Sequence, residues 1–167
     1  MNDINGGKSI GHGGFGCVFR PSIKCNSNSP SNKEISKLML KKDAEEEFNE
    51  ISFFATILSK IKNYNNYFLI DNIRLCQPSH LSSSDLKSFN KQCSALIKEG
   101  FTPDNINYKL NDLSMLVMPY GGISIEQYIN KNISSISLSE LNESMIDLLK
   151  NGILPMNKKK IFHADIK

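Results

Sequence analysis

The sequence lacks the features of membrane, secreted and fibrous proteins. Its 167 residues include no tryptophan, 10 glycines and 6 prolines, which excludes collagen-like and low-complexity chains. No apolar run reaches the roughly 18 residues of a membrane span. The first nine residues are polar, so we expect no signal peptide there. The length suffices for one domain with a hydrophobic core, or for part of a larger domain.

Charge of neither sign dominates. The chain has 20 Lys and Arg against 17 Asp and Glu, a formal net charge of +3, and these residues are spread along the sequence. A balance of this kind gives no reason to expect an acidic surface as partner. We therefore expect neither nucleic acid nor a membrane among the partners.

Cysteine is scarce, and its spacing favours no metal site. Cys17, Cys25, Cys76 and Cys93 form no CxxC pair and show no zinc-type spacing. Cys76 and His80 are close in the sequence, but two ligands do not make a metal site. Because no secretory segment is expected, we predict four reduced thiols in a cytosolic chain.

Several segments of the first 120 residues have the apolar alternation or β-branched content of strands. Strands are predicted within residues 9–23 (two short ones around glycines), over 34–40, over 67–75 and over 113–118. The segment 79–111 is polar, and we interpret it as an insertion or a long connection that holds one helix near residues 86–98.

Helical periodicity appears in three places. Residues 44–61 are predicted to form an amphipathic helix that Asp43 caps. Beyond a glycine-rich joint, helices are expected to begin at Ser124 and Ser137, and Gly152 is expected to end the second one. Strands with one helix are thus followed by helices, which predicts an α+β chain of two lobes.

A glycine-rich motif lies near the N-terminus. Residues 11–18 read Gly-His-Gly-Gly-Phe-Gly-Cys-Val and fit the pattern G-x-G-x-x-G-x-V. In a dinucleotide-binding unit the third glycine opens a helix, whereas here the sequence from Phe15 to Phe19 is β-prone and runs into Pro21. In such a hairpin, glycines let backbone N–H groups approach phosphate oxygens, and Phe15 could cover the phosphates. An ordinary glycine-rich hairpin is the alternative.

Lys37 stands in the middle of the third predicted strand, between apolar neighbours. Its side chain either extends to solvent or is aimed at phosphate oxygens and held by a carboxylate. The predicted helix that follows supplies the carboxylates. We expect Glu50 to be the partner, because it aligns with Phe54 beside the apolar stripe, and Glu46 and Glu47 are the alternatives.

Two further motifs follow in the second half. Residues 118–121 (Met-Pro-Tyr-Gly) end a strand in a flexible joint, where backbone groups can pair with a planar purine. Residues 163–167 (His-Ala-Asp-Ile-Lys) place an aspartate two residues before a lysine. The carboxylate could accept a hydroxyl proton while the ammonium holds the transferred phosphate. Taken alone, this pentapeptide is more typical of a solvated turn.

In this order, the four motifs resemble the protein kinase family of the serine/threonine type, from about Ile10 to Lys167 with residues 79–111 unmatched. The sequence around Lys37 looks like that of kinases of large DNA viruses. The resemblance implies an α+β, protein-kinase-like fold: a small β-rich N-lobe with helix C over residues 1–120, then a hinge and the start of a helical C-lobe over 121–167. It further implies ATP-dependent phosphoryl transfer to Ser or Thr hydroxyls of a protein substrate, with ATP and Mg²⁺ as cofactors. The implied location is cytoplasmic, in a host cell or a virion.

The resemblance also implies catalytic roles. Asp165 would orient and deprotonate the substrate hydroxyl, and Lys167 would neutralise charge on the γ-phosphate. Lys37, paired with Glu50, would hold the α- and β-phosphates.

The nucleotide-binding roles follow in the same way. The Pro119 carbonyl and the Gly121 N–H would contact adenine, next to the gatekeeper position at Met118. The glycine-rich loop would bind the phosphates through Gly11, Gly13, Gly14, Phe15, Gly16 and Val18.

The chain departs from the family's pattern at two points. Ala164 replaces the usual arginine, which puts activation through a phosphorylated loop in doubt. The family's two Mg²⁺ ligands would fall beyond Lys167, so we expect this chain alone to lack the metal site and to be an inactive part of a kinase. A non-catalytic nucleotide- or partner-binding remnant is the alternative. A small-molecule phosphotransferase of the same fold is a third interpretation.

Overall fold

The computed structural model describes residues 7–13, 16–26, 31–132 and 138–163. Contacts divide the chain into two compact units, residues 1–52 with 71–120 and residues 53–70 with 121–167. From the sequence, the chain was also divided at residue 120, into two kinase lobes that stay a prediction. Residues 53–70, in contrast, belong to the second unit and not to the first.

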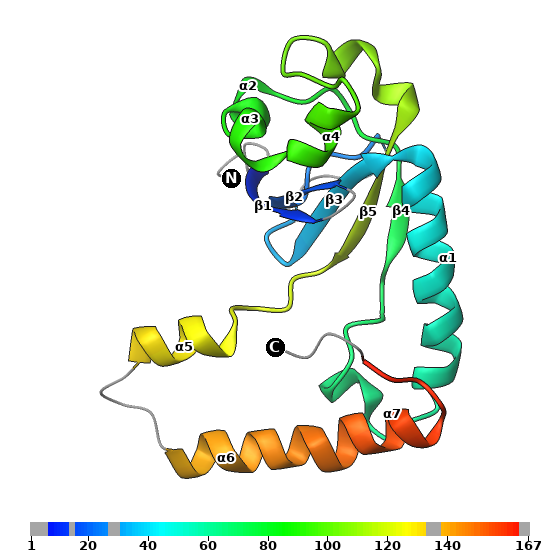
Figure 1. Ribbon diagram of the computed structural model, residues 1–167, viewed down its shortest axis with the longest axis vertical. Helices are drawn as coiled ribbons and strands as arrows, with labels where there is room; N and C mark the ends of the chain where they lie inside the picture. The colour runs from blue at the N-terminus through cyan, green and yellow to red at the C-terminus, as the bar shows by residue number, and fades with distance from the viewer. Residues whose placement is uncertain (1–6, 14–15, 27–30, 133–137, 164–167) are drawn as a thin grey trace. The chain divides into compact units, whose positions relative to one another are not determined.

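The first unit contains a five-stranded antiparallel sheet in the order β1-β2-β3-β5-β4 (Figure 1). The chain is therefore α+β, as predicted. The strand predicted over residues 67–75 is shorter and later than expected, because residues 67–73 belong to no strand and β4 begins only at Arg74. The strands are β1 (Lys8–Gly13), β2 (Gly16–Arg20), β3 (Glu34–Leu40), β4 (Arg74–Cys76) and β5 (Leu113–Pro119).

One face of the sheet is covered by the segment 79–111. This segment contains three short helices, α2 (Ser83–Leu86), α3 (Phe89–Gln92) and α4 (Ser94–Lys98), and not the single helix predicted. Its buried side chains pack with those of the strands in one hydrophobic core. The segment interpreted as an insertion is thus part of the core of the first unit. The core residues from the segment include Leu81, Phe89, Leu96, Phe101 and Ile106, and those from the sheet include Phe19, Leu38, Met115 and Val117.

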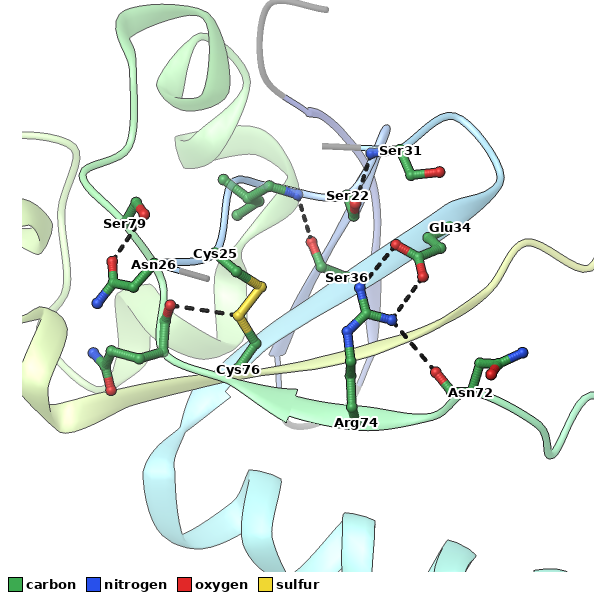
Figure 2. Close-up of a disulfide and its surroundings, with 12 residues drawn as sticks. Ser22, Cys25, Asn26, Ser31, Glu34, Ser36, Asn72, Arg74, Cys76 and Ser79 are labelled. Atoms are coloured by element: carbon green, nitrogen blue, oxygen red, sulfur yellow. Dashed lines mark hydrogen bonds and ion pairs between the residues drawn. A yellow bond between two sulfur atoms is a disulfide. The ribbon is translucent and has the colours of Figure 1, made fainter. Parts of the chain in front are cut away.

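The four cysteines form two disulfides, so the prediction of reduced thiols was wrong. Cys17 on β2 is bonded to Cys93, which lies between α3 and α4. Cys25, which follows β2, is bonded to Cys76 at the end of β4 (Figure 2). The partners are 76 and 51 residues apart in the sequence. Spacing alone could not reveal them, because the sheet and the segment 79–111 bring them together.

The helix α1 (Lys41–Leu58) follows β3 without a loop and begins three residues earlier than predicted (Figure 1). Its last turns and the helices after residue 120 form the second unit, around the buried side chains of Leu58, Ile61 and Met156. These helices are α5 (Ile125–Asn132), α6 (Leu138–Asp147), a π-helical segment (Leu148–Ile153) and α7 (Leu154–Lys158). No helix among the described residues has both the length and the apolar character needed to cross a membrane.

Gly152 does not end a helix, contrary to the prediction. It is buried within the π-helical segment, and the chain continues directly into α7. A Cβ atom at this position would lie 3.1 Å from the Tyr67 side chain. A glycine is therefore explained here by close packing against Tyr67 and not by the conformation of a helix terminus.

Candidate nucleotide site

The glycine-rich motif forms a β-hairpin. Gly13 pairs with Gly16, and Gly11 pairs with Val18, across β1 and β2. The third glycine therefore begins a strand and not a helix, which excludes the arrangement of a dinucleotide-binding unit. Gly14 and Phe15, expected at the tip, lie outside the described residues.

Gly16 also has a packing role at the base of this hairpin. A Cβ atom there would lie 2.5 Å from the carbonyl oxygen of Leu38 on β3. Any larger residue would push β2 away from β3. The third glycine of the motif is therefore required by the sheet itself, whether or not a phosphate binds nearby.

Lys37 lies in the middle of the sheet. It is directly opposite Val18 on β2 and Leu116 on β5, and residues opposite one another in antiparallel strands share a face. This is the face turned away from the core formed with the segment 79–111, because Leu38 and its neighbours on the other face belong to that core. The Lys37 side chain is 16% exposed.

The carboxylate that holds Lys37 is Glu47. The Lys37 Nζ atom lies 2.6 Å from the Glu47 Oε2 atom, and the Glu47 side chain is 26% exposed. Glu50 is exposed, so the prediction of Glu50 as the partner was wrong, and one of the two alternatives is correct. Because α1 begins directly after β3, its first two turns lie nearest to the strand, and Glu47 stands one turn before Glu50.

A second ion pair fixes the first residue of β3, Glu34, and nothing in the sequence pointed to it. Arg74 on β4 donates from Nη1 and Nη2 to the two carboxylate oxygens of Glu34, at 2.6 and 3.0 Å (Figure 2). The hydrogen bond lowers the pKa of Glu34 and raises the pKa of Arg74. Between the two ion pairs along β3, the buried Ser36 hydroxyl accepts a hydrogen bond of 2.9 Å from the Ile23 N–H. These contacts hold the strand that carries Lys37.

The residues expected at the hinge follow the end of β5. Met118 is half-buried and lies opposite Ile35, and Pro119 is the last residue of β5. The Tyr120 N–H donates to the Lys33 carbonyl at 2.9 Å, and the Arg20 guanidinium lies 3.4 Å from the centre of the Tyr120 ring. Sequence reasoning missed this cation–π contact. This contact fixes Tyr120, the last residue of the first unit. Gly121, which is exposed, is the first residue of the second unit's segment 121–167.

The motif that was predicted to be catalytic is described only at its first residue. His163 is exposed, and Asp165 and Lys167 lie outside the described residues. No cluster of three or more His, Cys, Asp or Glu suited to a metal ion occurs within the described ranges.

Comparisons with family models, with curated proteins and with solved structures found no match for this chain. Its function must therefore be inferred from its own residues.

Proposed function

We propose that the chain binds ATP through the first unit and belongs to a protein kinase that phosphorylates Ser or Thr hydroxyls. The ion pair between Lys37 and Glu47 carries this proposal. In protein kinases, the lysine that holds the nucleotide phosphates stands on the third strand and pairs with a glutamate of helix C, beneath a glycine-rich loop. Here a lysine on β3 pairs with a glutamate on the helix that follows, in a sheet whose first two strands form a glycine-rich hairpin.

Lys37 has hydrogen-bond donors left for a phosphate ligand. An ammonium group has three donors, and Glu47 is the partner of Lys37 among the described residues. Two donors are left for oxygens of a phosphate group. A lysine that is 16% exposed has little access to water, so charged oxygens at this position would satisfy those donors.

The proposed transfer step depends on residues of the last motif. Asp165 would accept the proton of the substrate hydroxyl as its oxygen attacks the γ-phosphorus, and Lys167 would stabilise the charge on the transferred group. Mg²⁺ bound to the nucleotide would neutralise charge on the β- and γ-phosphates. Met118, Pro119 and Gly121 would contact the adenine ring, by the resemblance described above.

Nucleotide titration tests the binding part of the proposal. A fluorescent ATP analogue is titrated into the 167-residue chain with Mg²⁺ present, and we expect Lys37→Met to weaken binding by tenfold or more. Lys33→Met is the matched control, because Lys33 is exposed and lies just before β3. Equal affinities of the Lys37→Met variant and the unmodified chain would overturn the proposal.

Transfer of labelled phosphate from ATP to a general protein substrate tests the catalytic part. We expect any transfer to be abolished by Asp165→Asn. Because the 167 residues alone are expected to lack the Mg²⁺ ligands, binding without transfer fits both interpretations, whereas transfer by this chain would contradict the alternative, a non-catalytic nucleotide-binding protein. Undiminished transfer by the Asp165→Asn variant would contradict the assigned role of that aspartate.

A further inference from the structure

An open cavity of about 580 Å³ with several lysines in its lining lies within the second unit. One wall comes from residues 60–67 after α1, and the other comes from the π-helical segment and α7. The apolar cluster around Leu58, Ile61 and Met156 holds the two walls together. A cavity of this volume is in the range of small-molecule sites. The polar lining residues are Lys60, Lys62, Asn63, Asn151, Lys158 and Lys159, with Tyr67 beside them.

The four lysines of this cavity have no carboxylate partner within the part of the chain that the structure describes. Asp147 does not line the cavity, but it contacts two residues that do, Tyr67 and Asn151. Its Oδ2 atom accepts a hydrogen bond of 2.9 Å from the Tyr67 hydroxyl, and its Oδ1 atom accepts one of 2.7 Å from the Asn151 amide. The same contact raises the pKa of Tyr67, so this hydroxyl keeps its proton and remains a donor to Asp147.

Helix termini explain only part of this arrangement. The C-terminal end of a helix attracts lysine side chains, because its carbonyl groups are partly negative. That effect is weak for α7, which has 5 residues, and it falls off within one turn. Lys62 lies beyond the end of α1 at Leu58. Lys60, Lys62 and Lys158 are exposed and Lys159 is half-buried, so all four side chains can reach a bound anion and give it charge-assisted hydrogen bonds.

We propose that this cavity binds a small anion that carries two or more phosphate groups. Lysine is a common phosphate ligand and acts as a mobile point charge, and the amide of Asn63 supplies an additional neutral donor. A small ligand is favoured over nucleic acid because the lysines line a cavity, whereas the chain as a whole has a net charge of only +3. The site is separate from Lys37, and the inference does not depend on the proposed kinase function.

Inorganic tripolyphosphate is the probe, titrated calorimetrically into the 167-residue chain at low salt. We expect the double variant Lys158→Gln/Lys159→Gln to bind at least tenfold more weakly. The control Lys87→Gln/Lys91→Gln removes the same charge from exposed positions of the first unit and should bind like the unmodified chain. Lys60→Gln/Lys62→Gln gives an independent second test from the other wall, and circular dichroism confirms that each variant is folded.

Lys37→Met separates this site from the proposed nucleotide site. It should leave the tripolyphosphate binding that requires Lys158 and Lys159 unchanged, and the Lys158→Gln/Lys159→Gln variant should bind the ATP analogue normally. No binding of tripolyphosphate at millimolar concentration, or equal weakening by the control variant, would overturn the inference. Binding of an RNA or a phosphopeptide, but not of tripolyphosphate, at these lysines would overturn it as well.

Discussion

The choice of carboxylate at Lys37 gives the sharpest test of the candidate site. We predict that Glu47→Gln weakens binding of the ATP analogue, because Gln keeps the shape of the side chain but removes the charge that holds Lys37. Both side chains of the pair are mostly shielded from water, at 16% and 26% exposure, and their atoms are 2.6 Å apart. A hydrogen bond between charged groups contributes about 1.5–3 kcal/mol.

The expected loss lies at the lower end of that range, because the Gln carbonyl can still accept a hydrogen bond from Lys37. A loss of about 1.5 kcal/mol corresponds to a roughly tenfold higher dissociation constant. Glu50→Gln is the matched control. It removes the same charge three residues further along α1, from a side chain that is exposed, and should change the dissociation constant less than about twofold.

Fluorescence titration measures both dissociation constants, and urea unfolding of each variant shows whether the fold has changed. If Glu50→Gln weakens binding and Glu47→Gln does not, the ion pair described here is not the one that positions Lys37 for phosphate. If both variants bind like the unmodified chain, Lys37 needs no carboxylate, and the resemblance to the kinase arrangement loses its physical basis.

Two further predictions concern the first unit. Replacing Cys25 and Cys76 by alanine should lower the free energy of unfolding by about 4 kcal/mol, because the disulfide closes a loop across a separation of 51 residues in the unfolded chain. Urea unfolding without reductant measures this difference. Coincident unfolding curves of the variant and the unmodified chain would contradict the prediction. Arg74 lowers the pKa of Glu34 below its ordinary value of 4.5, so this pair stabilises the fold above about pH 4.5, and its contribution is lost as the pH falls through the lower folded pKa. Glu34→Gln should therefore lower the free energy of unfolding at neutral pH and make its decline toward acid pH less steep. If the urea midpoints of the variant and the unmodified chain change in parallel with pH, this prediction is wrong.

Local patterns were sufficient to predict the elements that carry the site. The strand over 34–40 was predicted with the bounds of β3, because apolar and polar residues alternate along it. The glycine hairpin was predicted from the β-prone residues around the third glycine. The strand before the predicted hinge, β5, was predicted from a short apolar run. Each of these signals is contained within a few residues.

The partner of Lys37 was predicted from the alignment of Glu50 with the apolar stripe of the helix. Glu47 and Glu50 are three residues apart, so both lie on the same side of a helix. The signal at Asp43 placed the helix start too late, whereas β3 runs into α1 at Lys41. Glu50 was chosen because it aligns with Phe54, but Phe54 packs against the apolar cluster of Leu58, Ile61 and Met156, so that stripe did not mark the side of α1 that faces Lys37.

The disulfides and the role of the segment 79–111 were missed for a different reason, which is that they depend on contacts between distant parts of the chain. The segment is polar on average, yet Phe89, Cys93 and Leu96 are each at most 1% exposed. Single apolar residues within short helices have too little periodicity to reveal a buried face. They are recognised only when the sheet that they cover is known.

These missed contacts bear directly on the proposed site. Cys17 follows Gly16 at the base of the glycine hairpin, and its disulfide to Cys93 ties that base to the core formed with the segment 79–111. Gly16 packs against the carbonyl of Leu38, the residue after Lys37. The base of the hairpin and Lys37, the proposed phosphate ligand, are therefore held by the same two strands. A loosening of the core beneath Cys93 should displace the hairpin and Lys37 together, so the affinity for ATP should depend on a segment that has no residue in the site.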